Sequence, residues 1–165
     1  MLELRTLEPD DWPLWRGLRL AALAEAPSAF GSTLAEWQGP GDREERRRSR
    51  LSIPGARDLV AFVDGAPVGM ATGVPGDGSA TVELISMWVD PAARGKGVGD
   101  HLVREVERWA VERGATTLRL SVMPDNRSAT ALYERHGFTD TGEPGDSLPD
   151  GIGWERVMAK VLAGV

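Results

Sequence analysis

The chain of 165 residues has no cysteine, and this absence excludes several kinds of chemistry. Disulfide bonds, zinc sites held by thiolates and a cysteine nucleophile all require that residue. Histidine is almost as scarce. Its two residues, His101 and His136, have no carboxylates at a spacing typical of a metal site. We therefore expect no metal ion and no covalent intermediate on cysteine.

Long apolar runs are also missing. No stretch reaches the roughly 18 residues that a membrane-spanning helix needs. Residues 1–5 alternate between apolar and polar, unlike the apolar centre of a signal peptide. We expect a cytoplasmic protein that binds no membrane. A Gly-x-Ser-x-Gly motif is absent as well, which argues against a serine hydrolase.

Basic residues are outnumbered, with 19 Lys and Arg against 25 Asp and Glu, and the formal net charge is −6. This balance argues against nucleic acid as a partner and slightly favours cationic substrates such as amines. The hydrophobic share of 41% and the charged share of 27% are ordinary for a globular protein. The length suits one domain, over residues 1–165, with room for a core.

Apolar periodicity and turn-forming residues predict the order of strands and helices. Strands are expected at residues 2–7, 58–63, 67–74, 80–89, 117–122, from 138 onward, and at 154–162. Helices are expected at residues 12 to about 26, from 33 onward with a break at 39–41, at 98–113 and at 126–136. Asp64-Gly65 indicates a hairpin turn, and residues 142–151 a loop. The order β-α-α-β-β-β-α-β-α-β-β predicts an α/β (α+β) fold, a mixed sheet with helices on it.

The run Arg94-Gly95-Lys96-Gly97-Val98-Gly99 lies between an apolar strand and an amphipathic helix. Glycines let the backbone approach a ligand closely, and the first N–H groups of a helix have no partner within it. The helix dipole adds partial positive charge at the same place, so the run predicts a pyrophosphate site. The glycine spacing and the residue after the lysine differ from those of a nucleoside triphosphate loop, which argues against Mg-ATP.

The spacing Arg94-x-x-Gly97-x-Gly99 resembles the coenzyme A pyrophosphate motif Q/R-x-x-G-x-G/A of the GNAT N-acetyltransferase superfamily. Residues 122–138 are similar to a second GNAT signature, N-x-x-A-x-x-L-Y-x-x-x-G-F. It is matched by Asn126, Ala129, Leu132, Tyr133, Gly137 and Phe138. The resemblance implies a GNAT fold, with a mostly antiparallel twisted sheet of six to seven strands and about four helices. It also implies acetyl-CoA as cosubstrate, and homodimers are common in the superfamily.

The resemblance further assigns residues to the cofactor. The pyrophosphate would be bound by Arg94, Gly95, Lys96, Gly97, Val98, Gly99 and Asp100. We expect the Asp100 side chain to point outward, because its charge repels phosphate. Backbone groups of Met87 and Val89 would pair with the pantetheine as an added strand, beside Trp88, and the Val89 N–H would polarise the acetyl carbonyl. GNAT proteins usually splay this strand at a bulge, whose position the sequence does not give.

Asn126 and Tyr133 are seven residues apart, on one face of the expected helix, with the small residue Ala129 between them. Read from the residues alone, Asn126 or Asp125 caps the helix and Tyr133 is a half-buried aromatic. The resemblance implies instead that Asn126 and Ala129 bind the pantetheine arm. Tyr133, the single tyrosine of the chain, would then protonate the departing thiolate as a general acid.

Glu83 interrupts an apolar strand, where a charge is costly without a partner or a purpose. Either it reaches solvent at the strand edge, or it is the general base, with a pKa raised by burial. Counted back from Arg94, it matches the catalytic glutamate of histone-type GNAT enzymes. Phe30, in the expected loop at 27–32, and Trp88 are further candidates for the acceptor site, together with Glu83. The run of arginines at residues 46–48 predicts a solvated helix face rather than a nucleic-acid site, because Glu44 and Glu45 adjoin it.

The sequence thus predicts an acetyl-CoA-dependent N-acetyltransferase in which a primary amine attacks the thioester directly in a ternary complex. A catalytically silent acyl-CoA-binding sensor is the alternative, and a nucleotide-binding regulator is a third. The acceptor stays open among polyamines, aminoglycoside-like compounds, amino acids, and protein N-termini or lysines.

Overall fold

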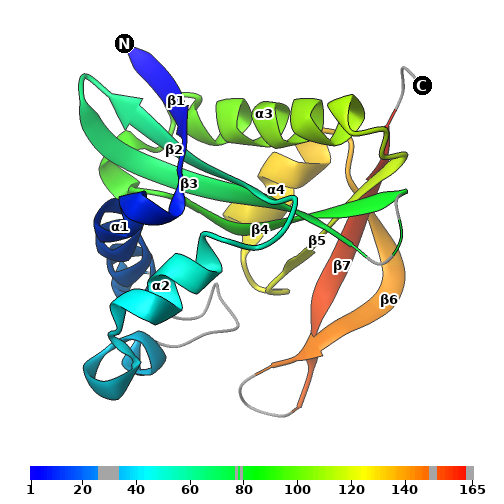
Figure 1. Ribbon diagram of the computed structural model, residues 1–165. Helices are drawn as coiled ribbons and strands as arrows, with labels where there is room; N and C mark the ends of the chain where they lie inside the picture. Colours follow the sequence, from blue (N-terminus) through cyan, green and yellow to red (C-terminus); the bar gives the residue numbers. More distant parts are fainter. Residues whose placement is uncertain (26–33, 77, 79, 149–151, 163–165) are drawn as a thin grey trace.

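The computed structural model describes residues 1–25, 34–76, 78, 80–148 and 152–162. Over these residues seven strands form one sheet in the order β1-β2-β3-β4-β5-β7-β6 (Figure 1). Neighbouring strands are antiparallel except for the parallel pair β4–β5. The strands are β1 (Leu2–Thr6), β2 (Arg57–Val63), β3 (Ala66–Pro75), β4 (Thr81–Val89), β5 (Thr117–Val122), β6 (Thr139–Ser147) and β7 (Trp154–Val161).

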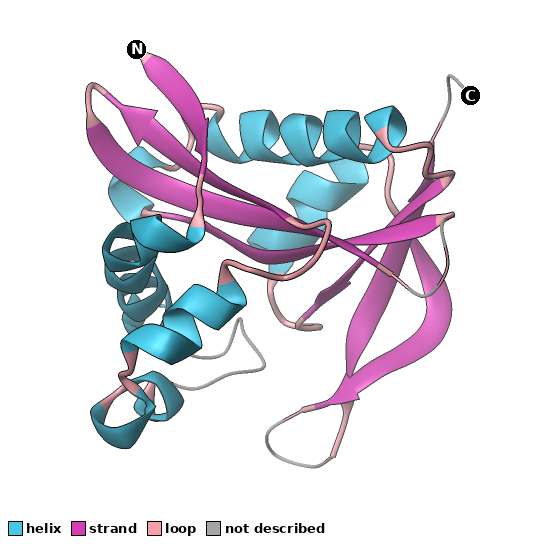
Figure 2. Ribbon diagram, in the orientation of Figure 1, coloured by secondary structure: helices cyan, strands magenta, loops and turns pink. Residues whose placement is uncertain are grey.

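Four α-helices accompany the sheet in the described ranges (Figure 2). They are α1 (Trp12–Glu25), α2 (Glu44–Arg50), α3 (Val98–Glu112) and α4 (Arg127–Arg135). The predicted order of elements and the mixed, mostly antiparallel sheet are confirmed. The helix expected from residue 33 is wrong before residue 44. The described part of that stretch forms two short 3₁₀ turns, Ala35–Trp37 and Gly39–Gly41, because glycine and proline do not continue an α-helix.

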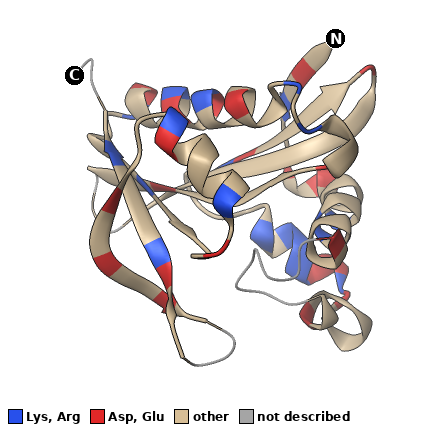
Figure 3. Ribbon diagram, turned by 180° about the vertical axis from the view of Figure 1, so that it is seen from behind, with Lys and Arg blue, Asp and Glu red and all other residues tan. Residues whose placement is uncertain are grey.

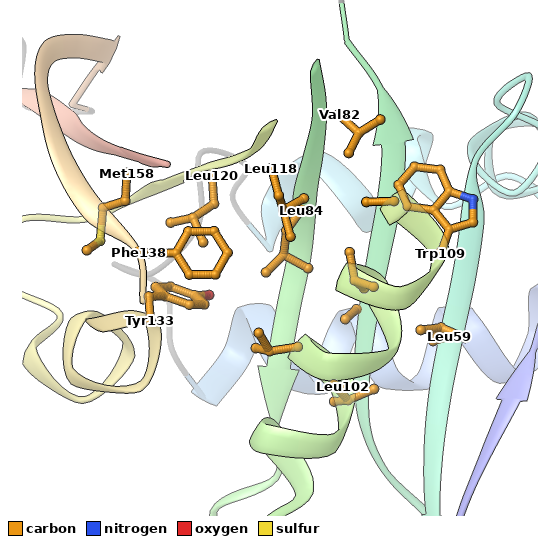
Figure 4. Packing of buried hydrophobic residues seen from close by; sticks show 14 of the residues in the cluster. Leu59, Val82, Leu84, Leu102, Trp109, Leu118, Leu120, Tyr133, Phe138 and Met158 are labelled. Carbon is orange, nitrogen blue, oxygen red and sulfur yellow. The ribbon is translucent and has the colours of Figure 1, made fainter. Parts of the chain in front are cut away.

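Each face of the sheet has its own hydrophobic core. On one face α3 buries Leu102, Val106 and Trp109 against the strands, and the ring of Tyr133 from α4 lies against that of Phe138 (Figure 4). On the other face Trp15 of α1 lies in a second core, together with Trp37, Met70 and Trp88. Residues with the expected helical spacing in α3 are all buried, so the amphipathic pattern determined which side of the helix faces the sheet.

The arginines of α2 do not form the solvated helix face that the sequence predicts. Arg47 is completely buried and donates hydrogen bonds to the Trp37 carbonyl at 3.0 Å and to Asp42 Oδ1 at 2.6 Å. The Arg46 guanidinium lies 3.7 Å from the centroid of the Trp37 ring. Figure 3 shows the positive charge gathered on α2. Paired carboxylates and an aromatic ring make these arginines part of the fold.

The expected loop at 142–151 is wrong in its first part, because β6 continues to Ser147. Proline and glycine residues gave this segment the composition of a loop. Among the described strands, β6 is the outermost and pairs only with β7, with register shifts on both sides of Pro144. An edge strand tolerates proline, because one side of its backbone needs no hydrogen-bond partner in the sheet.

Candidate active site

β4 and β5 separate soon after they begin. Their pairing runs from Thr81–Thr117 to Glu83–Arg119. On its other side, β4 shifts register against β3 between Met70 and Thr72, where it accommodates one extra residue. Ser86 lies in this bulge with φ 54°, a conformation uncommon outside glycine. The divergence leaves the β5-facing edge of β4 open beyond Glu83.

Ser86 is held in the bulge by a polar network that reaches across the sheet. Arg50 of α2 donates to Ser86 Oγ at 2.8 Å and to Asp58 Oδ1 at 2.9 Å, and Thr72 Oγ1 donates to the same carboxylate oxygen at 2.8 Å. The Arg50 and Asp58 side chains are only 14% and 5% exposed, so this ion pair is shielded from water. α2 therefore contributes directly to the shape of β4.

A cavity of about 990 Å³ opens where β4 and β5 part. The predicted cofactor residues line it with the exception of Lys96. They are Met87, Trp88, Val89, Arg94, Gly95, Gly97, Val98, Gly99, Asp100, Asn126, Ala129 and Tyr133. Glu83 is not among the lining residues, and Phe30 lies outside the described residues. Sequence reasoning missed further lining residues, among them Glu25, Ser86, Ser121, Asp125, Ser128 and Arg135.

The start of α3 lies in the lining of this cavity, and the first N–H groups of a helix have no partner within it. Gly97 is the N-terminal cap residue with φ 82°, and no side chain caps the helix. By contrast, the Asn126 side chain caps α4, and Asp90 caps the 3₁₀ turn Pro91–Ala93. The first turn of an uncapped helix binds anions through its N–H groups and its dipole. The residues present therefore fit a pyrophosphate.

The glycines of the run have different local roles. Gly95 and Gly97 have positive φ angles of 80° and 82°, and a Cβ would meet little or nothing around either of them. A Cβ on Gly99 would instead lie 3.2 Å from Leu132 Cδ2 and 3.5 Å from Met87 Cε. Gly95 and Gly97 shape the turn, whereas Gly99 lets α3 pack closely on α4 and β4.

The expectation that Asp100 points outward is wrong. Asp100 Oδ1 accepts hydrogen bonds from His136 Nε2 at 2.8 Å and from Arg135 at 3.0 Å, at the end of α4. Partial burial alone would raise the pKa of Asp100, but these hydrogen bonds outweigh it and lower that pKa below its ordinary value. The charge that would repel phosphate is thus partly balanced by α4.

Backbone groups of β4 face the gap as well. Asp90 N donates to Val68 O of β3 at 2.7 Å. The N–H and C=O of one strand residue point to the same edge, and those of the next residue point to the opposite edge. Because Asp90 faces β3, the N–H and C=O of Val89 point toward the β5 side. The Val89 carbonyl there accepts a hydrogen bond from Arg94 Nε at 2.9 Å. No described strand pairs with this edge of β4 beyond Glu83, so it offers an extended ligand a strand edge to pair with.

Tyr133 and Asn126 lie on the α4 side of the cavity. The Tyr133 ring is 5% exposed and packs edge-on against Phe138, with ring centroids 5.9 Å apart. Burial raises the pKa of Tyr133 well above its ordinary value, so the phenol keeps its proton. Asn126 Oδ1 accepts a hydrogen bond from Ala129 N at 3.2 Å. Asn126 is therefore a helix cap, as the residues alone indicated, and also a lining residue of the cavity.

Of the two alternatives for Glu83, the solvent-exposed position is the one observed, and the burial that would accompany the other is not. Its side chain is exposed, at the last paired position of β4 and β5. Trp88, by contrast, is buried and belongs to the core between the sheet and α1. Its indole N–H donates to Glu25 Oε1 at 3.0 Å. The sequence held little signal for Glu25, because a single acidic residue at the end of an apolar helix is a common pattern.

The described ranges contain neither a cluster of metal-ligating side chains nor a membrane-spanning helix. No group of three or more His, Asp or Glu side chains is placed to hold a metal ion among those residues. Nor is any helix within them long and apolar enough to cross a membrane.

Comparison with known proteins shows which family and which proteins this chain is similar to. The model of the acetyltransferase (GNAT) family matches residues 15–138. The putative phosphinothricin acetyltransferase YwnH of Bacillus subtilis is 38% identical over 79 residues, which are 47% of this chain and 47% of that protein. The chain thus spans about half the length of this relative.

Two further proteins are similar over longer stretches. The aminoglycoside N(6')-acetyltransferase type 1 of Salmonella enteritidis is 29% identical over 147 residues, 85% of this chain and 93% of that protein. The structure of the putative acetyltransferase yncA from Salmonella typhimurium with its cofactor acetyl-CoA superposes with a TM-score of 0.77. It has 22% identity and covers 100% of this chain and 96% of that chain, a likeness that shows the fold.

Proposed function

Because the chain belongs to the GNAT acetyltransferase family, we propose that it transfers the acetyl group of acetyl-CoA to a primary amine by direct attack in a ternary complex. The observation that carries the proposal is the cavity between the separated strands β4 and β5. It brings the open edge of β4, the uncapped start of α3 and the buried Tyr133 to one place. Bound acetyl-CoA supplies an acyl thioester, which amines attack readily.

The cofactor is held in this proposal by backbone groups more than by side chains. The first N–H groups of α3, from Val98 to Asp100, bind the pyrophosphate, and the glycines before them keep the approach open. Met87 and Val89 pair with the pantetheine through their β5-facing backbone groups. The Asn126 amide and Ala129 line the pantetheine arm from α4. Lys96, which is exposed and outside the cavity lining, adds positive charge near the entrance.

Three groups act at the reacting centre. The Val89 N–H donates to the acetyl carbonyl and stabilises the charge that develops on its oxygen. Tyr133 donates the proton that the departing thiolate takes up, a role supported by its protonated state. Glu83 accepts the proton of the attacking amine through water, since its exposed position lies outside the cavity lining.

The acceptor is a small molecule or a peptide that presents a primary amine. The two relatives are named for phosphinothricin and for an aminoglycoside, and these names favour no single acceptor. The alternative function, an acyl-CoA sensor without catalysis, keeps the same cofactor site. Tyr133 in the cavity favours the enzyme over the sensor, because a sensor needs no proton donor there.

Thiol release from acetyl-CoA tests the proposal. Purified protein is incubated with acetyl-CoA and a panel of polyamines, aminoglycosides, amino acids and peptides with free N-termini. We expect amine-dependent thiol release with at least one class, and a melting temperature raised by coenzyme A alone. Binding of coenzyme A without thiol release would favour the sensor. Stabilisation by ATP but not by coenzyme A would overturn both functions.

A further inference from the structure

Glu25 is the last residue of α1 and lines the cavity next to β4. Trp88 holds its carboxylate in place, because the buried indole N–H donates to Oε1 at 3.0 Å. A second donor, Arg94, reaches the same oxygen at 2.5 Å. Oε2 has no hydrogen-bond partner among the described residues. One carboxylate oxygen is therefore held in place, while the other is available on a side chain that is about one-third exposed.

Arg94 lines the cavity and connects β4 to α1. Its Nε donates to the Val89 carbonyl at 2.9 Å, and its terminal nitrogen reaches Glu25. In the proposed function, bound acetyl-CoA competes with both of these contacts. The Val89 carbonyl belongs to the strand edge that pairs with pantetheine, and a pyrophosphate bound at the start of α3 competes for the guanidinium. Arg94 therefore cannot keep both contacts when the cofactor site is filled.

We propose that Glu25 binds the ammonium group of the acceptor amine, and that in the ligand-free protein Arg94 covers this carboxylate until cofactor binding draws Arg94 away. The inference rests on the proposed function. Once Arg94 has left, the indole of Trp88 still holds Oε1. The carboxylate then faces the cavity without a cation, and an ammonium donates hydrogen bonds to it.

The other carboxylates that line the cavity suit this role less well. Asp100 already accepts hydrogen bonds from Arg135 and His136. Asp125 is exposed and has no ion pair or side-chain hydrogen bond within the described residues, so nothing fixes its direction. Glu25 combines a fixed oxygen, a place in the cavity and a cation that a ligand can replace. The acceptor class is then an amine that is still protonated when it enters.

Coenzyme A binding, measured by calorimetry, tests whether the cofactor draws Arg94 away from Glu25. This measurement needs no turnover. Glu25→Gln keeps an oxygen for Trp88 but loses the charge that attracts Arg94. We expect it to tighten coenzyme A binding about two- to fivefold, the range for a partly exposed ion pair. Asp125→Asn is the matched control, because it removes a carboxylate from the same cavity. In the Arg94→Gln background, Glu25→Gln should add no further change.

Kinetics with an amine that the wild type acetylates tests the binding role. Glu25→Gln should raise the KM for the amine about tenfold or more, the usual size for a lost charge-assisted contact, while kcat changes little. Weaker coenzyme A binding in Glu25→Gln, or a change no larger than in Asp125→Asn, would mean that Glu25 only fastens α1 to β4 and would overturn the inference. Failure of the wild type to bind coenzyme A would contradict the proposed function itself.

Discussion

The Asp100 carboxylate, in the first turn of α3, accepts a hydrogen bond from His136 Nε2 at the end of α4 over 2.8 Å. This contact joins the start of one cavity-lining helix to the end of the other. It places a negative charge at the positive end of the α3 dipole, where such a charge is stabilising. The same carboxylate also accepts a hydrogen bond from Arg135, so it holds both the last residue of α4 and the residue that caps it.

Asp100→Asn should lower the free energy of unfolding by about 0.5–1 kcal/mol at neutral pH, because the charged acceptor of both hydrogen bonds is lost. The pKa of Asp100 is lowered in the folded protein. Its contribution is therefore complete above the unfolded-state pKa of about 3.9 and is lost as the pH falls through the lower, folded-state pKa. Urea denaturation at several pH values measures the difference, which should be constant above about pH 5 and shrink below about pH 4.

Glu134→Gln is the control for this prediction, since it removes an exposed carboxylate of α4 that makes no ion pair within the described residues. It should leave the stability unchanged. A loss in Asp100→Asn that is the same at pH 3 and pH 7 would show that the charge of Asp100 plays no part.

Gly97→Asp should weaken coenzyme A binding by about tenfold or more, because it places a negative charge at the uncapped start of α3. Gly97→Asn is the matched control. Both side chains tolerate positive φ better than most, and a Cβ at this position meets only the His101 ring, at 3.8 Å. Thermal shift with coenzyme A measures both variants. Equal shifts in the two variants would place the pyrophosphate elsewhere.

Tyr133 should stay protonated in the folded protein above pH 10, because burial raises its pKa. It is the single tyrosine of the chain, so its ionisation is visible in the near-ultraviolet difference spectrum. The raised pKa stabilises the fold fully below the unfolded-state pKa of about 10, and this contribution is lost as the pH rises further. Tyrosinate absorbance should therefore appear together with unfolding, and its appearance in a folded protein near pH 10 would contradict this assignment.

Tyr133→Phe tests the catalytic role of the same residue. It should lower kcat by about 10²- to 10⁴-fold, the usual contribution of a general acid, with coenzyme A binding nearly unchanged. The ring and its packing against Phe138 are retained. A kcat within about twofold of the wild-type value would leave Tyr133 as a packing residue.

Ser86→Gly should be more stable than Ser86→Ala by about 1 kcal/mol, because glycine adopts positive φ without the steric cost that alanine has. Both variants lose the hydrogen bond from Arg50, so their difference isolates the backbone strain at φ 54°. Urea denaturation of the two variants measures it. Equal stabilities would mean that the bulge does not keep this conformation in solution.

Glu83→Gln should lower kcat/KM and remove the acidic limb of its pH profile if Glu83 accepts the amine proton. Glutamine keeps the size and hydrogen bonding of the side chain but cannot take up the proton. Stopped assays over a range of pH measure the profile. A folded variant with an unaltered profile would show that the proton leaves to solvent unaided, and that catalysis depends on proximity and Tyr133.

Local sequence patterns predicted β4, α3 and α4 well, because each has a strong period and clear ends. Leu102 and Val106 repeat at helical spacing, and Gly114 and Gly137 follow α3 and α4 with positive φ. Most of the predicted cofactor residues lie in or next to these elements, which explains why they line one cavity.

Contacts between distant segments were beyond such patterns. Glu25 and Trp88 are 63 residues apart, and Arg50 and Ser86 are 36 residues apart. The spacing of the residues near these positions does not predict either contact. The burial of Arg47 depends in the same way on Asp42 and Trp37, and the strand β6 depends on its pairing with β7. Sequence periodicity reports which side of an element is apolar, not which polar groups meet across it.

Side chains of β4 alternate between the two faces of the sheet, and the bulge at Ser86 shifts this alternation by one residue. Val82 and Leu84 belong to the core under α3, and beyond the bulge Met87 and Val89 pack against that same core while Trp88 turns to the other. Leu84 and Met87 are three positions apart, an odd offset that regular alternation would place on opposite faces, and the extra residue of the bulge brings them to the same face. Straightening the bulge without a change of length would therefore exchange the two sets, with the indole under α3 and the β5-facing backbone groups of Val89 turned toward β3. The bulge is thus as constrained as the identity of the residues beyond it.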